Sequence, residues 1–196
     1  MTPPLPNKKY DIIYADPPWH YRGRKQFGFA GDVGVDSGGA INQYAVLTTE
    51  EIGRMLVHLI AESDALLFIW IPGPLLIDGL IVIDAWNFEY KRDAFQWNKV
   101  VTNPGYYTLT QVETCYVGKR GRIPQPRGSR NERQYLETRE MTDLDYNQYI
   151  EQRRGKHSAK PAEVRDRITR MFPTQKKIEL FARERVEGWD CWGNEV

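Results

Sequence analysis

The four residues Asp16-Pro17-Pro18-Trp19 follow a short β-rich run, and their types suit chemistry on an aromatic amine. The nitrogen of such an amine becomes tetrahedral and positively charged as it attacks a methyl sulfonium. The Asp16 carboxylate and the Pro17 carbonyl, held in advance by a proline-locked turn, could accept hydrogen bonds from its two hydrogens. Trp19 could stack on the base that carries the amine. The alternative interpretation is a turn that ends a strand, with Asp16 in a capping-like role and Trp19 in the core.

Strands and helices are expected to alternate along the chain, beginning with a strand over 10–16 that ends at the two prolines. Thr48 and Glu51 form a capping box, and apolar residues at helical spacing predict a helix that continues to Ile60. The other expected elements are strands over 65–71, 90–97, 113–117 (with a start at Leu109 as the alternative), 177–182 and 189–192, a crossover helix over 74–86, and a helix that begins at Pro161. This alternation predicts a single α/β domain over residues 1–196. Its sheet is mostly parallel with helices on both faces, and its ligands bind at the carboxyl ends of the strands.

Composition excludes several classes of protein. The 196 residues include 27 Lys and Arg against 26 Asp and Glu, and this net charge of +1 excludes a protein that coats nucleic acid by bulk charge. A hydrophobic content of 41% argues against disorder, while two cysteines and three histidines give neither a disulfide framework nor metal-ligand spacing. The start of the chain lacks a signal-like apolar core, and Pro72-Gly73-Pro74 interrupts the apolar stretch 65–85. We therefore expect a cytoplasmic protein that uses no metal and no membrane.

Several spaced motifs together resemble the DPPW-type N6-adenine methyltransferases. This family includes the catalytic subunit of the eukaryotic mRNA adenosine methyltransferase and short bacterial and phage enzymes. The motifs occur in the family's order and cover nearly the whole chain from Tyr10 onward. They are the catalytic strand and turn at 10–19, the central strand at 65–70, the glutamate-bearing strand at 113–118, the box at 156–161, and the closing segments at 177–183 and 188–195.

The resemblance implies a Rossmann-like methyltransferase fold in a permuted motif order, with S-adenosyl-L-methionine as the cofactor. It implies that the catalytic residues are Asp16, Pro17, Pro18 and Trp19. The cofactor-binding residues that it implies are Asp16, Lys160, Arg183, Asn194 and Glu195, with Lys160 on the cofactor's carboxylate. The substrate-binding residues that it implies are Trp19, Tyr44, Glu113 and His157.

Several of these side chains also have a purely structural interpretation. Lys160 lies just before a predicted helix N-terminus, where free amides and the helix dipole favour an anion, but by itself it could be a solvated lysine. Arg183 could pair with a neighbouring glutamate, and Glu113, which is costly to bury alone, could pair with an arginine. Tyr44 could be a loop aromatic that covers the core, and residues 194–195 could belong to a frayed terminus.

Three clusters of basic residues stand beside these motifs in the sequence. We expect them to contact phosphates, and the alternative for each is a solvated face. The clusters are Arg22, Arg24 and Lys25; Lys119, Arg120, Arg122, Arg127 and Arg130; and Arg153, Arg154 and Lys156.

The leading hypothesis is an enzyme that methylates the N6 amino group of adenine in nucleic acid, with DNA favoured over RNA. The target base must leave its stack, because N6 inside a duplex is not open to in-line attack. The alternatives are an RNA N6-adenine methyltransferase, a non-catalytic nucleic-acid-binding subunit of a methyltransferase complex, and methylation of cytosine N4. The sequence leaves open whether the protein forms a homodimer or needs a partner subunit.

Overall fold

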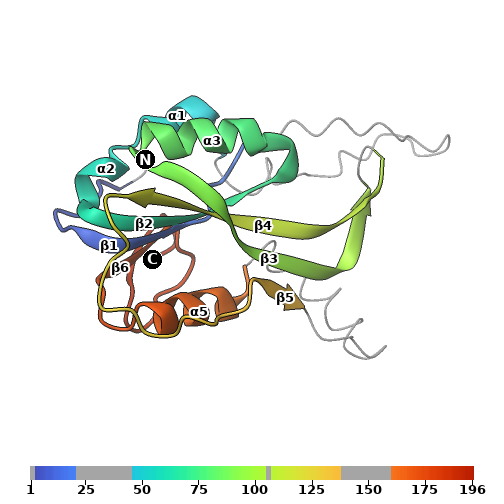
Figure 1. Ribbon diagram of the computed structural model, residues 1–196. Coiled ribbons are helices and arrows are strands. Elements are labelled where there is room, and N and C mark those ends of the chain that lie inside the picture. Colours follow the sequence, from blue (N-terminus) through green and yellow to red (C-terminus); the bar gives the residue numbers. More distant parts are fainter. Residues whose placement is uncertain (1–2, 21–45, 105–106, 138–159) are drawn as a thin grey trace.

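The computed structural model describes residues 3–20, 46–104, 107–137 and 160–196, and these residues form a seven-stranded sheet with helices on both faces (Figure 1). The strand order is β5-β3-β4-β2-β1-β6-β7. Neighbouring strands are parallel except for β4, which is antiparallel to both β2 and β3. The mostly parallel α/β sheet predicted from the sequence is therefore confirmed. The strands are β1 (Tyr10–Ala15), β2 (Ala61–Ile71), β3 (Glu89–Pro104), β4 (Leu109–Arg120), β5 (Tyr135–Glu137), β6 (Lys177–Leu180) and β7 (Asp190–Trp192).

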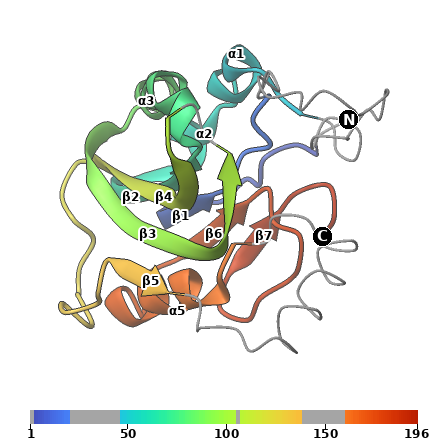
Figure 2. The same ribbon diagram turned by 90° about the vertical axis from the view of Figure 1, so that its right-hand side faces the viewer.

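Helices cover the two faces of the sheet separately. Figures 1 and 2 show α1 and α3 on one face and α5 on the other. Thr48 caps α1 through the predicted capping box with Glu51, and Pro161 occupies the N-cap of α5. The helices are α1 (Thr49–Gly53), α2 (Val57–Ile60), α3 (Leu76–Ala85), which follows a 3-10 turn (Gly73–Leu75), and α5 (Ala162–Met171).

The apolar strands are buried on both faces because each face has its own hydrophobic core. Along β1, Ile13 and Ala15 pack into the core beneath α1 and α3, whereas Ile12 and Tyr14 pack into the core beneath α5. Successive side chains of a strand point to opposite faces, so a strand between two cores must be apolar at every position. This explains the uninterrupted apolar runs of β1 and β2.

Two expectations about element boundaries were wrong. The apolar spacing between Ile52 and Ile60 predicted one helix, but the chain forms two short helices, and Leu56 and Leu59 are more than half exposed. The backbone leaves the helical region at Leu56 (φ −79°, ψ 47°), so the apolar positions of the two helices do not share one face. The strand expected over 90–97 extends to Pro104, and β4 has the alternative start at Leu109, because β3 and β4 pair with each other as a hairpin beyond the rest of the sheet.

The carboxyl ends of four parallel strands meet at one edge of the sheet, which faces the viewer in Figure 2. Ala15 pairs with Ile69 on one side and with Leu180 on the other, and Leu180 pairs with Trp192. Asp16 therefore lies beside the last residues of β2 and the segment that follows β6, and the end of β7 is one strand further along. β4 runs the opposite way, so it is the beginning of this strand that reaches the same edge.

Gly193 allows the segments that follow β6 and β7 to touch. A Cβ at this position would lie 2.5 Å from the Ala182 carbonyl oxygen, and the Ala182 amide donates to the Trp192 carbonyl at 2.9 Å. Phe181, between β6 and Ala182, takes the left-handed backbone conformation with φ 62°. This turn ends β6 at Leu180, two residues earlier than the sequence suggested.

No helix in the part of the chain that the structure describes is long and apolar enough to cross a membrane. The apolar stretch 65–85 consists instead of most of β2, the turn at Pro72-Gly73-Pro74, and α3.

Gly79 sets how closely α3 approaches the end of β2, and its replacement should destabilise the protein. A Cβ at Gly79 would lie 2.3 Å from Cδ1 of Ile71, which is only 2% exposed. We expect Gly79→Ala to lower the free energy of unfolding by about 1–3 kcal/mol, because overpacking outweighs the better helix propensity of alanine. Gly53→Ala is the matched control, since its Cβ would make an ordinary 3.5 Å contact with Ala85. Urea unfolding measures both, and equal effects would contradict the packing argument.

Candidate active site

Four side chains from four elements form a chain of alternating charge at the carboxyl edge of the sheet. The Lys160 ammonium, directly before α5, lies 3.1 Å from Oδ2 of Asp16 and 3.2 Å from Oε2 of Glu113 in β4. The other Glu113 oxygen, Oε1, lies 2.5 Å from the ammonium of Lys99 in β3. The Lys160 side chain is 12% exposed and that of Lys99 is 16% exposed, so both pairs lie largely out of solvent. Two carboxylates and two ammonium groups therefore balance one another.

The electrostatics of this chain keep its two central members ionised. Burial by itself disfavours the Lys160 ammonium, but the carboxylates of Asp16 and Glu113 outweigh it and raise the pKa of Lys160. Burial likewise disfavours the Glu113 carboxylate, but Lys160 and Lys99 outweigh it and lower the pKa of Glu113. Glu113 is thus paired, as its position in a buried strand required, although its partners are lysines and not the arginine that the sequence suggested.

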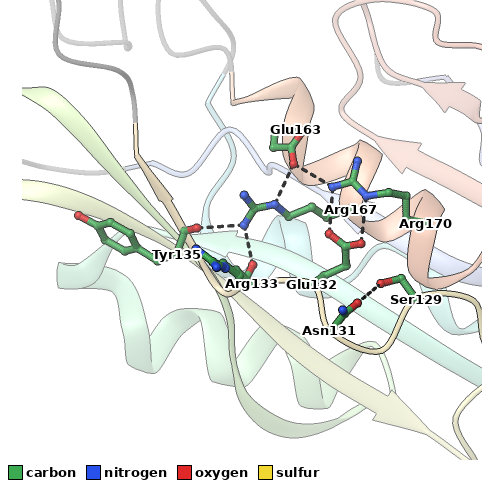
Figure 3. A network of polar contacts seen from close by, with 8 residues as sticks. All are labelled: Ser129, Asn131, Glu132, Arg133, Tyr135, Glu163, Arg167 and Arg170. Atoms are coloured by element: carbon green, nitrogen blue, oxygen red, sulfur yellow. Dashed lines mark hydrogen bonds and ion pairs between the residues drawn. The ribbon is translucent and has the colours of Figure 1, made fainter.

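Lys160 is held in place by the attachment of α5 to the segment that precedes β5 (Figure 3). The guanidinium of Arg170 binds both carboxylate oxygens of Glu132, at 3.0 and 2.9 Å. Glu163 accepts from both Arg167 and Arg170, and Arg167 also donates to the carbonyl oxygens of residues 133 and 135. These contacts join successive turns of α5 to one loop, and they fix the direction in which its N-terminus delivers Lys160.

A second attachment ties the first turn of α5 to the strand beside β1. The buried guanidinium of Arg165 donates to Glu179 in β6 at 2.8 Å and to Glu184, beyond the end of β6, at 2.7 Å. Burial raises the pKa of Glu179, and Arg165 opposes that shift. The same guanidinium therefore positions both α5 and the segment that contains Arg183.

The proline turn after β1 is fixed by hydrogen bonds at both prolines. The carbonyl of Pro17 accepts from the Trp19 amide at 2.8 Å, and the carbonyl of Pro18 accepts from the Leu47 amide at 2.8 Å. The indole Nε1 of Trp19 donates to the carbonyl of Trp70 at 2.9 Å, and Trp19 is 8% exposed. The described residues thus place Trp19 as an anchor of the turn in the core. Its stacking on a base stays a prediction.

Two further buried groups lie close to the chain of charges and stay protonated. Burial raises the pKa of the Cys115 thiol, and Asp16 adds to that shift. Burial also raises the pKa of Tyr14, whose hydroxyl accepts a 2.7 Å hydrogen bond from the indole of Trp70. A protonated, buried thiol is a poor nucleophile, so Cys115 is not a candidate nucleophile.

The remaining predicted site residues fall into two groups. Arg183, Asn194 and Glu195 are exposed and follow β6 and β7, and therefore lie at the same edge as Asp16. Tyr44 and His157 lie outside the described residues.

The basic cluster at Lys119–Arg130 was expected beside the catalytic motifs, but it begins at the opposite edge of the sheet. Lys119 pairs with Leu66, and Leu66 pairs with Ile12, near the start of β1. Asp16 lies four residues further along, about 13 Å at the rise of a strand. Because β4 is antiparallel to β2, the residues that follow Glu113 along β4 run away from the edge that holds Asp16, and phosphate contact by this cluster stays a prediction.

The side chains of this cluster are also engaged within the protein. Arg120 donates to the carbonyl of His58 at 2.7 Å, and Arg122 lies 3.4 Å from a carboxylate oxygen of Asp64. The guanidinium of Arg127 lies 5.0 Å from the centre of the Phe172 ring. The other two basic clusters, at 22–25 and 153–156, lie outside the described residues.

Sequence reasoning missed Lys99. The residue is one of many lysines in the chain, and its partner Glu113 is 14 positions away. The register of β3 and β4, which pairs Trp97 with Glu113, brings the two together. The signal that could have found Lys99 is the carboxylate of Glu113 within an otherwise apolar strand, because a buried charge needs cations nearby.

Two cavities of about 730 and 770 Å³ lie along the N-terminal segment and not at the chain of charges. One is lined by Lys8, Tyr10 and Asp190, and the other by the exposed leucines of α2 and its approach. Neither is lined by Asp16 or Lys160. The candidate active site is therefore identified by its charges and its place at the sheet edge.

Comparison with known proteins identifies the class to which the fold and this edge belong. A model of the MT-A70 family matches residues 10–195, so the chain belongs to the MT-A70 family and is a methyltransferase. It is 44% identical over 206 residues to the Type II methyltransferase M.MunI of a Mycoplasma species, covering 100% of this chain and 82% of that protein.

More distant similarity extends to eukaryotic proteins. The chain is 25% identical over 198 residues to the N(6)-adenosine-methyltransferase catalytic subunit METTL3 of Homo sapiens, spanning 28% of that protein. It is 26% identical over 198 residues to the N(6)-adenine-specific methyltransferase METTL4 of Mus musculus, spanning 38% of that protein.

We expect the 2.5 Å contact with Lys99 to favour the ionised form of Glu113 and thereby to stabilise the fold. The folded pKa of Glu113 lies below its ordinary value of about 4.3, so its ionisation stabilises the fold above that pH. This contribution is lost as the pH falls through the folded pKa. Lys99→Met removes one of the two cations while burial remains, so we expect the pKa to rise. The free energy of unfolding should fall by about 1–3 kcal/mol at pH 7, and the acid loss of stability should begin at a higher pH.

Urea unfolding between pH 3 and pH 8 measures this effect. Lys91→Met is the matched control, because Lys91 lies on the same strand and pairs with the exposed Glu89. A shift of the acid limb in the control equal to that in Lys99→Met would show that Glu113 is not responsible.

Proposed function

We propose that this protein transfers a methyl group from S-adenosyl-L-methionine to N6 of adenine in DNA. The observation that supports this most directly is the Asp16 carboxylate at the head of a proline turn, paired with a buried lysine at the edge of the sheet where α/β folds bind ligands. DNA is favoured because the relative that matches the whole chain is named a Type II methyltransferase. The relatives named for adenosine or adenine are matched over only 28% and 38% of their length.

The charges at this edge fit the methionine part of the cofactor, which has both a carboxylate and an ammonium group. The Lys160 ammonium has three N–H donors, and Asp16 and Glu113 account for two of them. The third donor would hold the cofactor's carboxylate, and Asp16 would accept from its ammonium group. Arg183, Asn194 and Glu195 would bind the ribose and adenosine parts, since the segments that follow β6 and β7 are held together at Gly193.

When bound, S-adenosylmethionine supplies an electrophilic methyl sulfonium. The protein's own contribution is to prepare the amine of the flipped base. The Asp16 carboxylate accepts a hydrogen bond from N6 and stabilises the positive charge that develops on this nitrogen. The Pro17 carbonyl, which the Trp19 amide already fixes in direction, has a second lone pair for the other N6 hydrogen. Because both acceptors are held in advance, little reorganisation is needed during the reaction.

Glu113 and Lys99 determine how strongly the Lys160 ammonium pairs with Asp16. Without Glu113, the Lys160 ammonium would pair with Asp16 alone and draw the carboxylate away from the substrate. Held between two carboxylates, the ammonium can leave one Asp16 oxygen available to N6. His157 and Tyr44 complete the adenine pocket in this proposal. Trp19 supports the turn through its hydrogen bond to the Trp70 carbonyl and also contacts the base.

Asp16→Asn should abolish most of the methyl transfer while the fold survives. The amide keeps the shape of the side chain but loses the negative charge, and the loss of such a preorganised contact costs about 100-fold or more in rate. The matched control is Asp84→Asn, on the exposed face of α3, which should keep full activity. Activity of Asp16→Asn within about tenfold of wild type would remove Asp16 from the reaction.

The same assay identifies the product. The protein is incubated with cofactor and with DNA or RNA, and the nucleosides are then separated and identified by mass spectrometry. We expect N6-methyladenine from DNA. Methylation of RNA alone, methylated cytosine without methylated adenine, or the absence of cofactor binding would each replace the proposal with one of its alternatives.

A further inference from the structure

The hairpin of β3 and β4 continues past the edge of the sheet as a two-stranded ribbon. The pairing of β4 with β2 ends at Thr114, opposite Ile71, and the pairing of β3 with β5 ends at Asn98. Beyond Asn98 opposite Val112 the register shifts by an irregularity in β3, and pairing resumes with Asn103 opposite Thr110 and Pro104 opposite Leu109. We call residues 100–104 and 107–112 the β3–β4 arm. Figure 1 shows the arm extending beyond the other strands on the right-hand side.

The β4 side of the arm is exposed and is a direct continuation of the candidate active site. All six residues from Tyr107 to Val112 are exposed, including Leu109 at 66% and Tyr107 at 97%. Side chains two apart on a strand share a face, so Gln111 and Leu109 lie on the same face of β4 as Glu113. Outward from Glu113, this face therefore presents the amide of Gln111 and then the aliphatic side chain of Leu109. The four residue steps from Glu113 to Leu109 span about 13 Å.

The chemistry of the arm suits base edges better than phosphates. Residues 100–112 contain no charged side chain, but they include amide, hydroxyl, aliphatic and aromatic groups. Phosphate contacts are made chiefly by Lys and Arg, whereas Gln pairs with adenine and apolar groups contact the thymine methyl. The major groove of B-DNA is about 12 Å wide and admits a two-stranded β-ribbon. The size and the composition of the arm both match this groove.

We propose that the β3–β4 arm enters the major groove of DNA beside the target adenine and reads the neighbouring base pairs, with Gln111 and Leu109 as specificity-determining residues. This proposal rests on the proposed function, since it requires that the substrate is duplex DNA. N6 of an unflipped adenine also lies in the major groove.

The test measures which adenines the protein methylates. Duplex DNA with randomised bases around a central adenine is treated with the protein and the cofactor, and the methylated molecules are sequenced. We expect the wild type to prefer particular flanking bases. Gln111→Ala should lose about 5- to 150-fold of the discrimination at one or two positions, which corresponds to one lost bidentate contact of about 1–3 kcal/mol. Leu109→Ala should lose discrimination at a different position.

Matched controls lie at the opposite edge of the sheet. Gln125→Ala and Ile123→Ala replace a glutamine and an aliphatic residue at exposed positions in the loop after β4, and they should leave the preference unchanged. The thermal midpoint of every variant checks that it is folded, and its mass in solution is measured as well.

Two results would overturn the arm's role while leaving the proposed function intact. One is an unchanged preference in both arm variants, or no preference in the wild type. The other is a change of oligomeric mass in the arm variants, which would make the arm a contact for a second protein subunit. A wild-type protein that methylates no DNA at all would instead refute the proposed function itself.

Discussion

The structure depends on one buried ammonium group that is shared by two carboxylates. Lys160 cannot be buried without anionic partners, and neither Asp16 nor Glu113 can be buried without a cation. Each of the three residues comes from a different part of the sequence: before α5, after β1 and within β4. The folded chain is therefore required to bring these three elements to one edge, and Lys99 in β3 completes the balance of charge.

The direction of each strand decides which residues reach this edge. Asp16, Arg183 and Asn194 follow parallel strands, so they lie at carboxyl ends that are side by side. Glu113 reaches the same edge by the opposite route, near the beginning of an antiparallel strand. The same reversal takes the later residues of β4, including Arg120, to the far edge. A single antiparallel strand thus adds a carboxylate to the site and removes a basic cluster from it.

The polar contacts that surround the site serve to position it. The Arg170–Glu132 pair and the Arg165 contacts hold α5 at its two ends, and the indole of Trp19 fastens the proline turn to the end of β2. Some of these ion pairs are exposed and contribute little to stability individually. Their joint effect is to fix the geometry of groups whose chemistry depends on direction. Regular elements therefore anchor the site residues, whereas residues 107–112 of the β3–β4 arm are exposed.

The class of fold and the candidate site residues could be predicted from local patterns in the chain. Uninterrupted apolar strands require a sheet that is covered on both faces, and the Asp16 turn, the lysine before Pro161 and the glutamate in an apolar strand are local features of the chain. How these residues combine depends on contacts that form only in the folded protein. Strand register paired Lys99 with Glu113 and carried Lys119 away from Asp16, and close packing at the end of β2 placed the Trp19 indole in the core. Register and packing are contacts between distant segments, so no local pattern of residue types specifies them.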